Sequence, residues 1–168
     1  INYSFNGGDI SLVFSDENQN QRSLKNIKSK SLLSQLDFGF DRIQILGISG
    51  NLARGDFLLK YEGANISGAS FLKANLVDLP GLKKNQNLFG LGFDYSGINN
   101  LTIGYEGNLR IIDNYSDDLT IAKQTLGHSV QVRWTGLNDL LSINANLSRL
   151  TGEKSIIGSL ATSYKPRD

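Results

Sequence analysis

The sequence of 168 residues contains no cysteine and no methionine, only two prolines and a single histidine. Without cysteine, the chain has no disulfide scaffold, no thiolate metal site and no cysteine nucleophile. One histidine excludes the histidine-rich zinc and iron sites, so we expect neither a bound metal nor another cofactor. Because methionine is absent and the sequence begins with Ile1, we expect that an N-terminal portion is missing.

The sequence also has no excess of charge of one sign and no long hydrophobic run. Lysine and arginine total 17 and aspartate and glutamate total 16, which gives a net charge of +1. This balance argues against nucleic acid as a partner. The hydrophobic content of 39% is too high for a disordered chain. However, no apolar run reaches the roughly 18 residues of a membrane helix. We expect one β-domain over residues 1–168.

The feature that is present is strict alternation of apolar and polar residues, which is the period of a β-strand. It is clearest over residues 100–111, where every second residue from Leu101 to Ile111 is apolar or glycine and the residues between them are polar or glycine. The same period runs through 56–63, 88–95, 129–135, 141–149 and 155–164. The best helical candidate, residues 23–36, is rich in serine and lysine, so a short helix and a polar loop are both compatible with it.

Turn residues separate these strands in an order typical of antiparallel hairpins. Asn6-Gly7-Gly8-Asp9 predicts a tight turn, and similar signals occur at 96–99 and 136–139. Longer polar connections are expected at 16–31, 49–55 and 78–87, with bends near 41–42 and 65–68 and a polar tip at 113–118. Short turns at one end and long loops at the other predict an all-β, antiparallel up-and-down meander of about 10–12 strands that closes into a β-barrel. The alternative is a two-sheet β-sandwich.

In a membrane barrel, one face of each strand contacts lipid and the other faces the lumen. The apolar faces of 88–95, 100–111 and 129–135 carry no charged residue. The candidate lipid-facing residues are Phe89, Leu91, Phe93, Leu101, Ile103, Tyr105, Val130, Val132 and Trp134. The opposite faces carry charges of both signs. The candidate lumen-facing residues are Lys60, Glu62, Asp94, Glu106, Arg110 and Arg133.

Two segments resemble hairpins of bacterial outer-membrane β-barrels. They are LFGLGFDYSGINNLTIGYEGNLRI (residues 88–111) and LLSINANLSRLTGEKSIIGSLATSY (residues 140–164). The texture of residues 88–164 is similar to that of OmpA-like barrels and autotransporter translocators. This resemblance implies an outer-membrane location and a role as membrane anchor, small porin-like pore or translocator. It also implies the lipid bilayer and lipopolysaccharide as partners.

A different class of protein is compatible with the same alternation. A secreted or cell-surface β-sandwich, such as an adhesin, a glycan-binding protein or a surface-assembly subunit, buries its apolar face inside. A lipocalin-like barrel is a third alternative. In each case, the loops at 16–31 and 78–87 are candidate surfaces for protein partners. We expect no enzymatic activity, because the lone His128 has no visible nucleophile or acid partner in the sequence.

Overall fold

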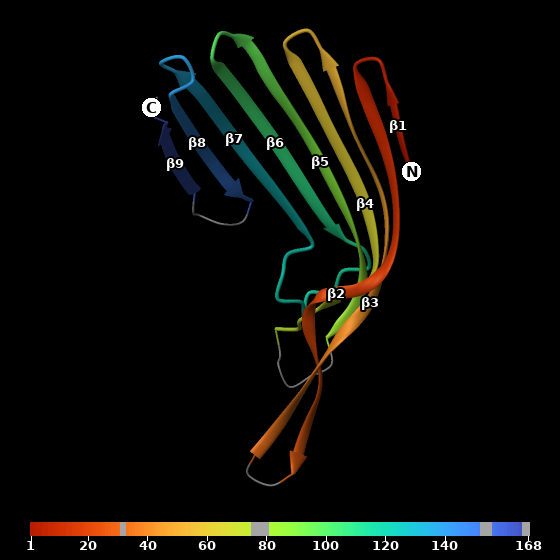
Figure 1. Cartoon of the computed structure of the whole chain (residues 1–168). Coiled ribbons are helices and arrows are strands. Elements are labelled where there is room, and N and C mark those ends of the chain that lie inside the picture. The colour runs from red at the N-terminus through yellow and green to blue at the C-terminus, as the bar shows by residue number, and fades with distance from the viewer. Residues whose placement is uncertain (31–32, 75–80, 152–155, 166–168) are drawn as a thin grey trace.

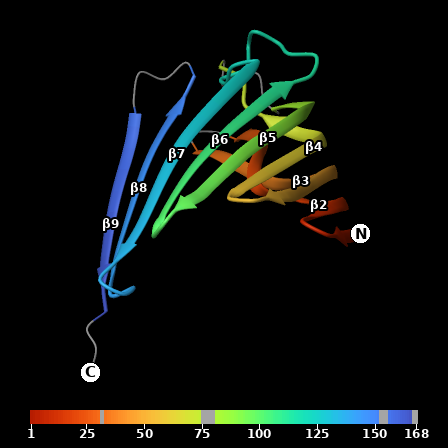
Figure 2. The ribbon, with the colours of Figure 1, turned by 90° about the horizontal axis from the view of Figure 1, so that it is seen from above.

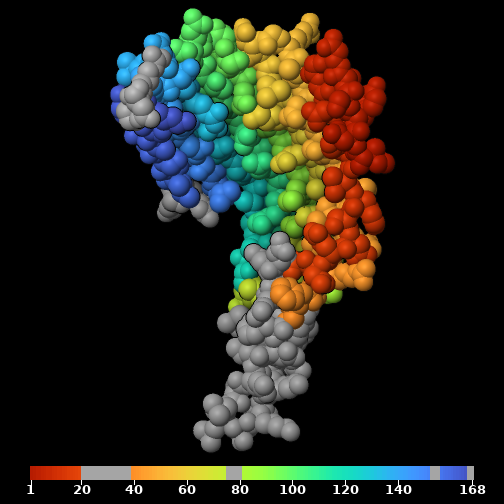
Figure 3. All heavy atoms as spheres, in the orientation of Figure 1, coloured from red at the N-terminus to blue at the C-terminus, as the bar shows by residue number. Residues whose placement is uncertain are grey.

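The computed structural model describes residues 1–30, 33–74, 81–151 and 156–165. They form one sheet of nine antiparallel strands in which each strand pairs with the next along the chain. Figure 1 shows the meander, and Figure 3 shows the strands side by side from the red N-terminal edge to the blue C-terminal edge. The strands are β1 (Asn2–Phe5), β2 (Gly8–Lys30), β3 (Leu33–Arg54), β4 (Phe57–Phe71), β5 (Leu82–Ile98), β6 (Leu101–Ile112), β7 (Gln124–Gly136), β8 (Leu141–Leu150) and β9 (Ile156–Tyr164).

The all-β, antiparallel, up-and-down fold predicted from the alternation is confirmed. Tight turns join the strands at one end of the sheet, and Gly7 and Gly55 adopt φ values of 84° and 59° in two of them. These positive φ values favour glycine, which has no Cβ to clash with the backbone. Asn100 takes a φ of 64° in a third turn, as asparagine readily does.

The long connections predicted at 16–31 and 49–55 are wrong, and so is the helix considered at 23–36. Residues 8–30 form the continuous strand β2, which pairs with β3 as far as Lys30 opposite Leu33. Polar strands of this kind form because backbone hydrogen bonds between partners outweigh the weak local preference of serine and lysine. The paired ends of β2 and β3 extend beyond the other strands (Figure 1).

Several predicted breaks are strand irregularities instead. The expected bend at 41–42 lies inside β3, and the expected turn at 65–68 is a β-bulge in β4, between Ile66 and Ala69. A bulge inserts one extra residue without ending the strand. The predicted loop at 78–87 is strand from Leu82 onward, and its residues 78–80 lie outside the described part of the chain. These merged strands explain why the sheet has nine strands and not ten or more.

The sheet curves strongly, as Figure 2 shows from above, but the described residues do not close it into a barrel. Within the described strands, β9 pairs only with β8 and β1 pairs only with β2. The short β1 covers only residues 8–11 of β2 by register. The alternative of a two-sheet sandwich does not fit the described residues either, because their strands form a single sheet. The fold therefore offers two broad faces and two free edges.

Candidate functional site

The strand register gathers the apolar residues on one face of the sheet, which we call the apolar face. One cross-strand row contains Leu59, Phe93, Tyr105, Val130 and Leu147. The next row towards the tight turns contains Phe57, Tyr95, Ile103, Val132 and Ala145. All of the predicted lipid-facing residues lie on this face: Phe89, Leu91, Phe93, Leu101, Ile103, Tyr105, Val130, Val132 and Trp134. Whether lipid covers them stays a prediction.

This face is open to the surroundings. Leu91 is 60% exposed, Phe14 on β2 is 74% exposed and Leu160 on β9 is 72% exposed. Among the described residues, the buried hydrophobic side chains are only Ile43, Ala69, Ile112 and Leu119. Soluble monomers rarely expose contiguous apolar patches larger than a few hundred Å². The apolar face of this sheet extends across eight neighbouring strands, from β2 to β9.

A row of polar residues ends the apolar face at the side away from the tight turns. We call this row, formed by Asp16, Gln44, Asn65, Asn87 and Asp113, the polar belt. Asn65 Nδ2 donates to Asn87 Oδ1 at 2.8 Å, and Asn87 Nδ2 donates to Asp113 Oδ1 at 2.9 Å. Gln44 Nε2 donates to Asp16 Oδ2 at 3.4 Å. The belt crosses β2 to β5 and ends at Asp113, directly after β6.

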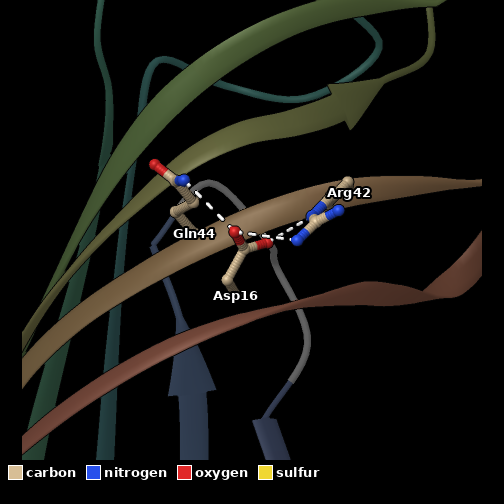
Figure 4. Close-up of polar contacts among 3 residues, drawn as sticks. All are labelled: Asp16, Arg42 and Gln44. Carbon is tan, nitrogen blue, oxygen red and sulfur yellow. Dashed lines mark hydrogen bonds and ion pairs between the residues drawn. The ribbon is translucent and has the colours of Figure 1, made fainter.

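An ion pair strengthens the belt at β2 and β3. Arg42 donates to Asp16 through Nε at 2.6 Å and through Nη2 at 3.1 Å, as Figure 4 shows. Such bidentate pairing is the strongest geometry for an arginine and a carboxylate. One residue pair lies between those of Asp16 and Arg42 in the register, since Asp16 pairs with Gln44 and Asn18 pairs with Arg42.

Aromatic side chains gather where the apolar face meets the tight turns. The rings of Phe57 and Tyr95 lie 4.8 Å apart, next to the turn between β3 and β4. Trp134 and Tyr164 lie towards the same end of β7 and β9. Tyrosine and tryptophan are enriched at membrane–water interfaces because one part of the ring is apolar and another part is polar.

The opposite surface, which we call the polar face, carries all of the predicted lumen-facing residues: Lys60, Glu62, Asp94, Glu106, Arg110 and Arg133. Lys60 Nζ lies 2.8 Å from Asp94 Oδ2 and 3.7 Å from Glu106 Oε1. Arg133 Nε donates to Asn144 Oδ1 at 3.0 Å. Among these residues, Lys60 is therefore ion-paired with acidic groups on two neighbouring strands.

Two glycines make room for these carboxylates. A Cβ at Gly104 would lie 2.7 Å from Asp94 Oδ1, and one at Gly92 would lie 3.0 Å from Glu106 Cγ. The polar face is also hollowed near this cluster. A hollow of about 280 Å³ is lined by residues that include Asp9, Asn51, Lys60, Glu62, Glu106 and Asn108. A hollow lined by charged and amide groups is suited to water or hydrated ions, and not to an apolar ligand.

Residues 113–123, which connect β6 to β7 and which we call the strap, lie against the end of the polar face. The backbone of the strap pairs with the segment that follows β4. Ala74 N donates to Asp118 O at 2.7 Å, and Thr120 N donates to Leu72 O at 3.0 Å. Lys73 Nζ lies 3.8 Å from Asp118 Oδ2. A hydrogen bond from Ser116 lowers the pKa of Asp118, and the charge of Lys73 lowers it further.

His128 lies on the apolar face, where it contacts Tyr105. Its Nδ1 lies 2.6 Å from the hydroxyl oxygen of Tyr105, and the two rings are 6.0 Å apart. Among the described residues, no group of three or more metal-binding side chains comes together. The described part of the chain likewise contains no helix that is long and apolar enough to cross a bilayer.

Sequence reasoning missed the polar belt and the strap. The belt had a signal in the sequence, because Asn65 and Asp113 each occupy the next alternate position after an apolar series, and Asn87 occupies the one before its series. The strap had none, because its partners at 72–74 are about 45 residues away in the chain and pair through backbone atoms.

Comparisons with protein-family models, with curated proteins and with solved structures found no match to this chain. The structural class of this protein is therefore described from its own fold and surfaces. It is an antiparallel up-and-down β-sheet with an exposed apolar face and a polar face that carries balanced charges.

Proposed function

We propose that this protein is a wall of a bacterial outer-membrane β-barrel and serves as a membrane anchor or a small pore. The observation that carries the proposal is the exposed apolar face, which the polar belt limits at one end and aromatic side chains limit at the other. On β4 to β7, the part of this face between the belt and the turns carries no aspartate, glutamate, lysine or arginine. A bilayer supplies the continuous apolar environment that this face requires.

The dimensions of the face support this assignment. The longest apolar series, Leu101 to Ile111 on β6, is about 33 Å long at a rise of roughly 3.3 Å per residue. At the tilt of about 40° that outer-membrane strands adopt, it would span about 25 Å, which is the height of the apolar band of such barrels. The polar face would then line the lumen, where the pairing of Lys60 with Asp94 lowers the cost of enclosing charge.

The free edges set a condition on this function. Unpaired N–H and C=O groups within hydrocarbon cost several kcal/mol each, so open sheet edges do not occur there. In the membrane, the outer edges of β9 and of β1 with β2 must therefore be paired with each other or with further strands. The bilayer and lipopolysaccharide are the partners of this proposal.

The proposal is tested by placing one arginine on each face. Leu91→Arg puts a cation at the middle of the apolar face, at a cost of roughly 2–4 kcal/mol if that position lies near the bilayer midplane. We expect Leu91→Arg to reduce insertion into lipid vesicles strongly, as measured by flotation and protection from protease. Gln131→Arg, on the polar face, is the matched control and should insert like the unmodified protein.

Equal insertion of both variants would contradict the proposal. If the unmodified protein is monodisperse without detergent and does not float with vesicles, the secreted or cell-surface adhesin becomes the better hypothesis. In that case the apolar face would be covered by a protein partner.

A further inference from the structure

The strap crosses the polar face and not the apolar face. Lys84 and Ile112 both lie in the polar-face register, since Lys84 pairs with Ala69 and Ile112 pairs with Gln86. Lys84 Nζ donates to Asn114 O of the strap at 2.6 Å. Ile112, at the end of β6, is almost completely buried. The strap therefore covers the polar face where β4 and β6 end and β5 begins.

The strap is held at several independent points. Lys73 and Leu119 form a β-bridge, flanked by the two backbone hydrogen bonds from Ala74 and Thr120. Thr120 Oγ1 adds a bond to Leu72 O at 3.2 Å, and Tyr115 Oη donates to Ile121 O at 3.0 Å within the strap. Leu119 is one of the few buried apolar side chains of the described residues. These contacts describe a fixed element and not a loop that swings freely.

We propose that the strap is a fixed constriction at one end of the lumen, so that the membrane-inserted protein conducts small hydrated ions poorly. This inference rests on the membrane function proposed above. The hollow beside Lys60, Glu62 and Glu106 lies nearer the tight turns and is lined by no strap residue. The polar face is thus open to water from the turn end and obstructed at the strap end.

The geometry allows the strap to be removed without disturbing the strands. Ile111 pairs with Gln124, and Ile112 N donates to Lys123 O at 3.0 Å. The two ends of the strap therefore lie opposite each other on the neighbouring strands β6 and β7. Residues 114–121 can therefore be replaced by Asn-Gly, the preferred two-residue hairpin turn. Asp113 is kept, together with its hydrogen bonds to Asn87.

The test measures insertion and conductance separately. Vesicle flotation reports insertion, and planar-bilayer recording with potassium chloride reports ion passage. We expect the variant without the strap to insert as the unmodified protein does and to conduct several times more. Leu119→Ser, which loosens the strap without shortening it, should give an intermediate conductance. Leu137→Ser, in an exposed turn at the opposite end, is the control and should leave conductance unchanged.

A cysteine pair reports the position of the strap in the membrane. The chain has no cysteine of its own, so Ala74→Cys with Asp118→Cys introduces the sole pair. We expect this pair to form a disulfide in the inserted protein. If the variant without the strap inserts normally and conducts no more than the unmodified protein, the constriction is overturned. Failure of the two introduced cysteines to form a disulfide in the inserted protein would also overturn it. Failure of the unmodified protein to insert would instead overturn the proposed function, and the constriction with it.

Discussion

At the scale of single residues, the polar face depends on charges that are paired at its surface. Lys60 lies between Asp94 and Glu106, with side chains that are partly exposed to solvent. Pairs of this kind stabilise proteins weakly, because water already solvates both ions and ordering the side chains costs entropy. Their main effect is therefore on which charges the face presents, and less on whether the sheet forms.

We expect a double-mutant cycle on Lys60→Met and Asp94→Asn to give a coupling energy of roughly 0.5–1 kcal/mol, the upper part of the range for exposed pairs. The free energy of unfolding in urea, measured on the folded protein in detergent, provides the four values. The same cycle on Lys60 and Glu106 should give a smaller coupling, because those atoms are 3.7 Å apart and not 2.8 Å. An equal or larger coupling to Glu106 would contradict the geometry.

At the scale of elements, the strands are positioned by pairing that local sequence does not reveal. The polar sequence of β2 after residue 16 favours a loop when read alone, yet it pairs with β3 as far as Lys30, with two register shifts on the way. The strap shows the same effect, since its partners come from the far side of β5. Contacts between residues so far apart in the sequence form only when the sheet brings the two segments together.

The strap should respond to acid through Asp118. The lowered pKa of this carboxyl group means that its charge stabilises the folded strap. That contribution is fully present above the ordinary pKa of 3.8 and is lost as the pH falls through the lowered pKa. We expect the amides of Ala74 and Thr120 to exchange hydrogen faster below this range, after correction for intrinsic rates.

Asp118→Asn is the control for this acid response. It removes the titrating group, so the corrected exchange rates at Ala74 and Thr120 should no longer depend on pH in the acidic range. A pH step that persists in this variant would assign the response to another carboxyl group.

At the scale of the whole molecule, the distribution of apolar surface is the reverse of that in a soluble domain. The buried core of the described residues is small, and the large apolar side chains lie on an exposed face. Hydrophobic burial is the dominant favourable term in folding, so the sheet needs an apolar environment to be stable. The free edges add the need for strand pairing on both sides.

These needs predict a compact, detergent-dependent fold. If the sheet edges pair to close a barrel in detergent, as the proposed function requires, the unboiled protein should migrate on a gel at a different apparent mass from the boiled protein, because a closed β-barrel resists unfolding by the detergent of the gel. Leu91→Arg should reduce the fraction that shows this shift. Identical migration before and after boiling, together with a monodisperse protein in plain buffer, would contradict the membrane assignment.

The sequence by itself determined the all-β meander and the division of residues between two faces. Both follow from the two-residue period of the strand, which sets the side of the sheet on which Leu91 or Glu106 lies as soon as the strand exists. Only the tertiary structure decided that β2 continues past residue 16, that Asn65, Asn87 and Asp113 join into a belt, that the strap reaches 72–74, and that the sheet stays open. The physical reason is that these features depend on contacts between distant segments. The continuation of β2 and the position of the strap depend on backbone hydrogen bonds, and backbone groups are the same in every residue except proline. The belt depends on the strand register that brings its side chains together.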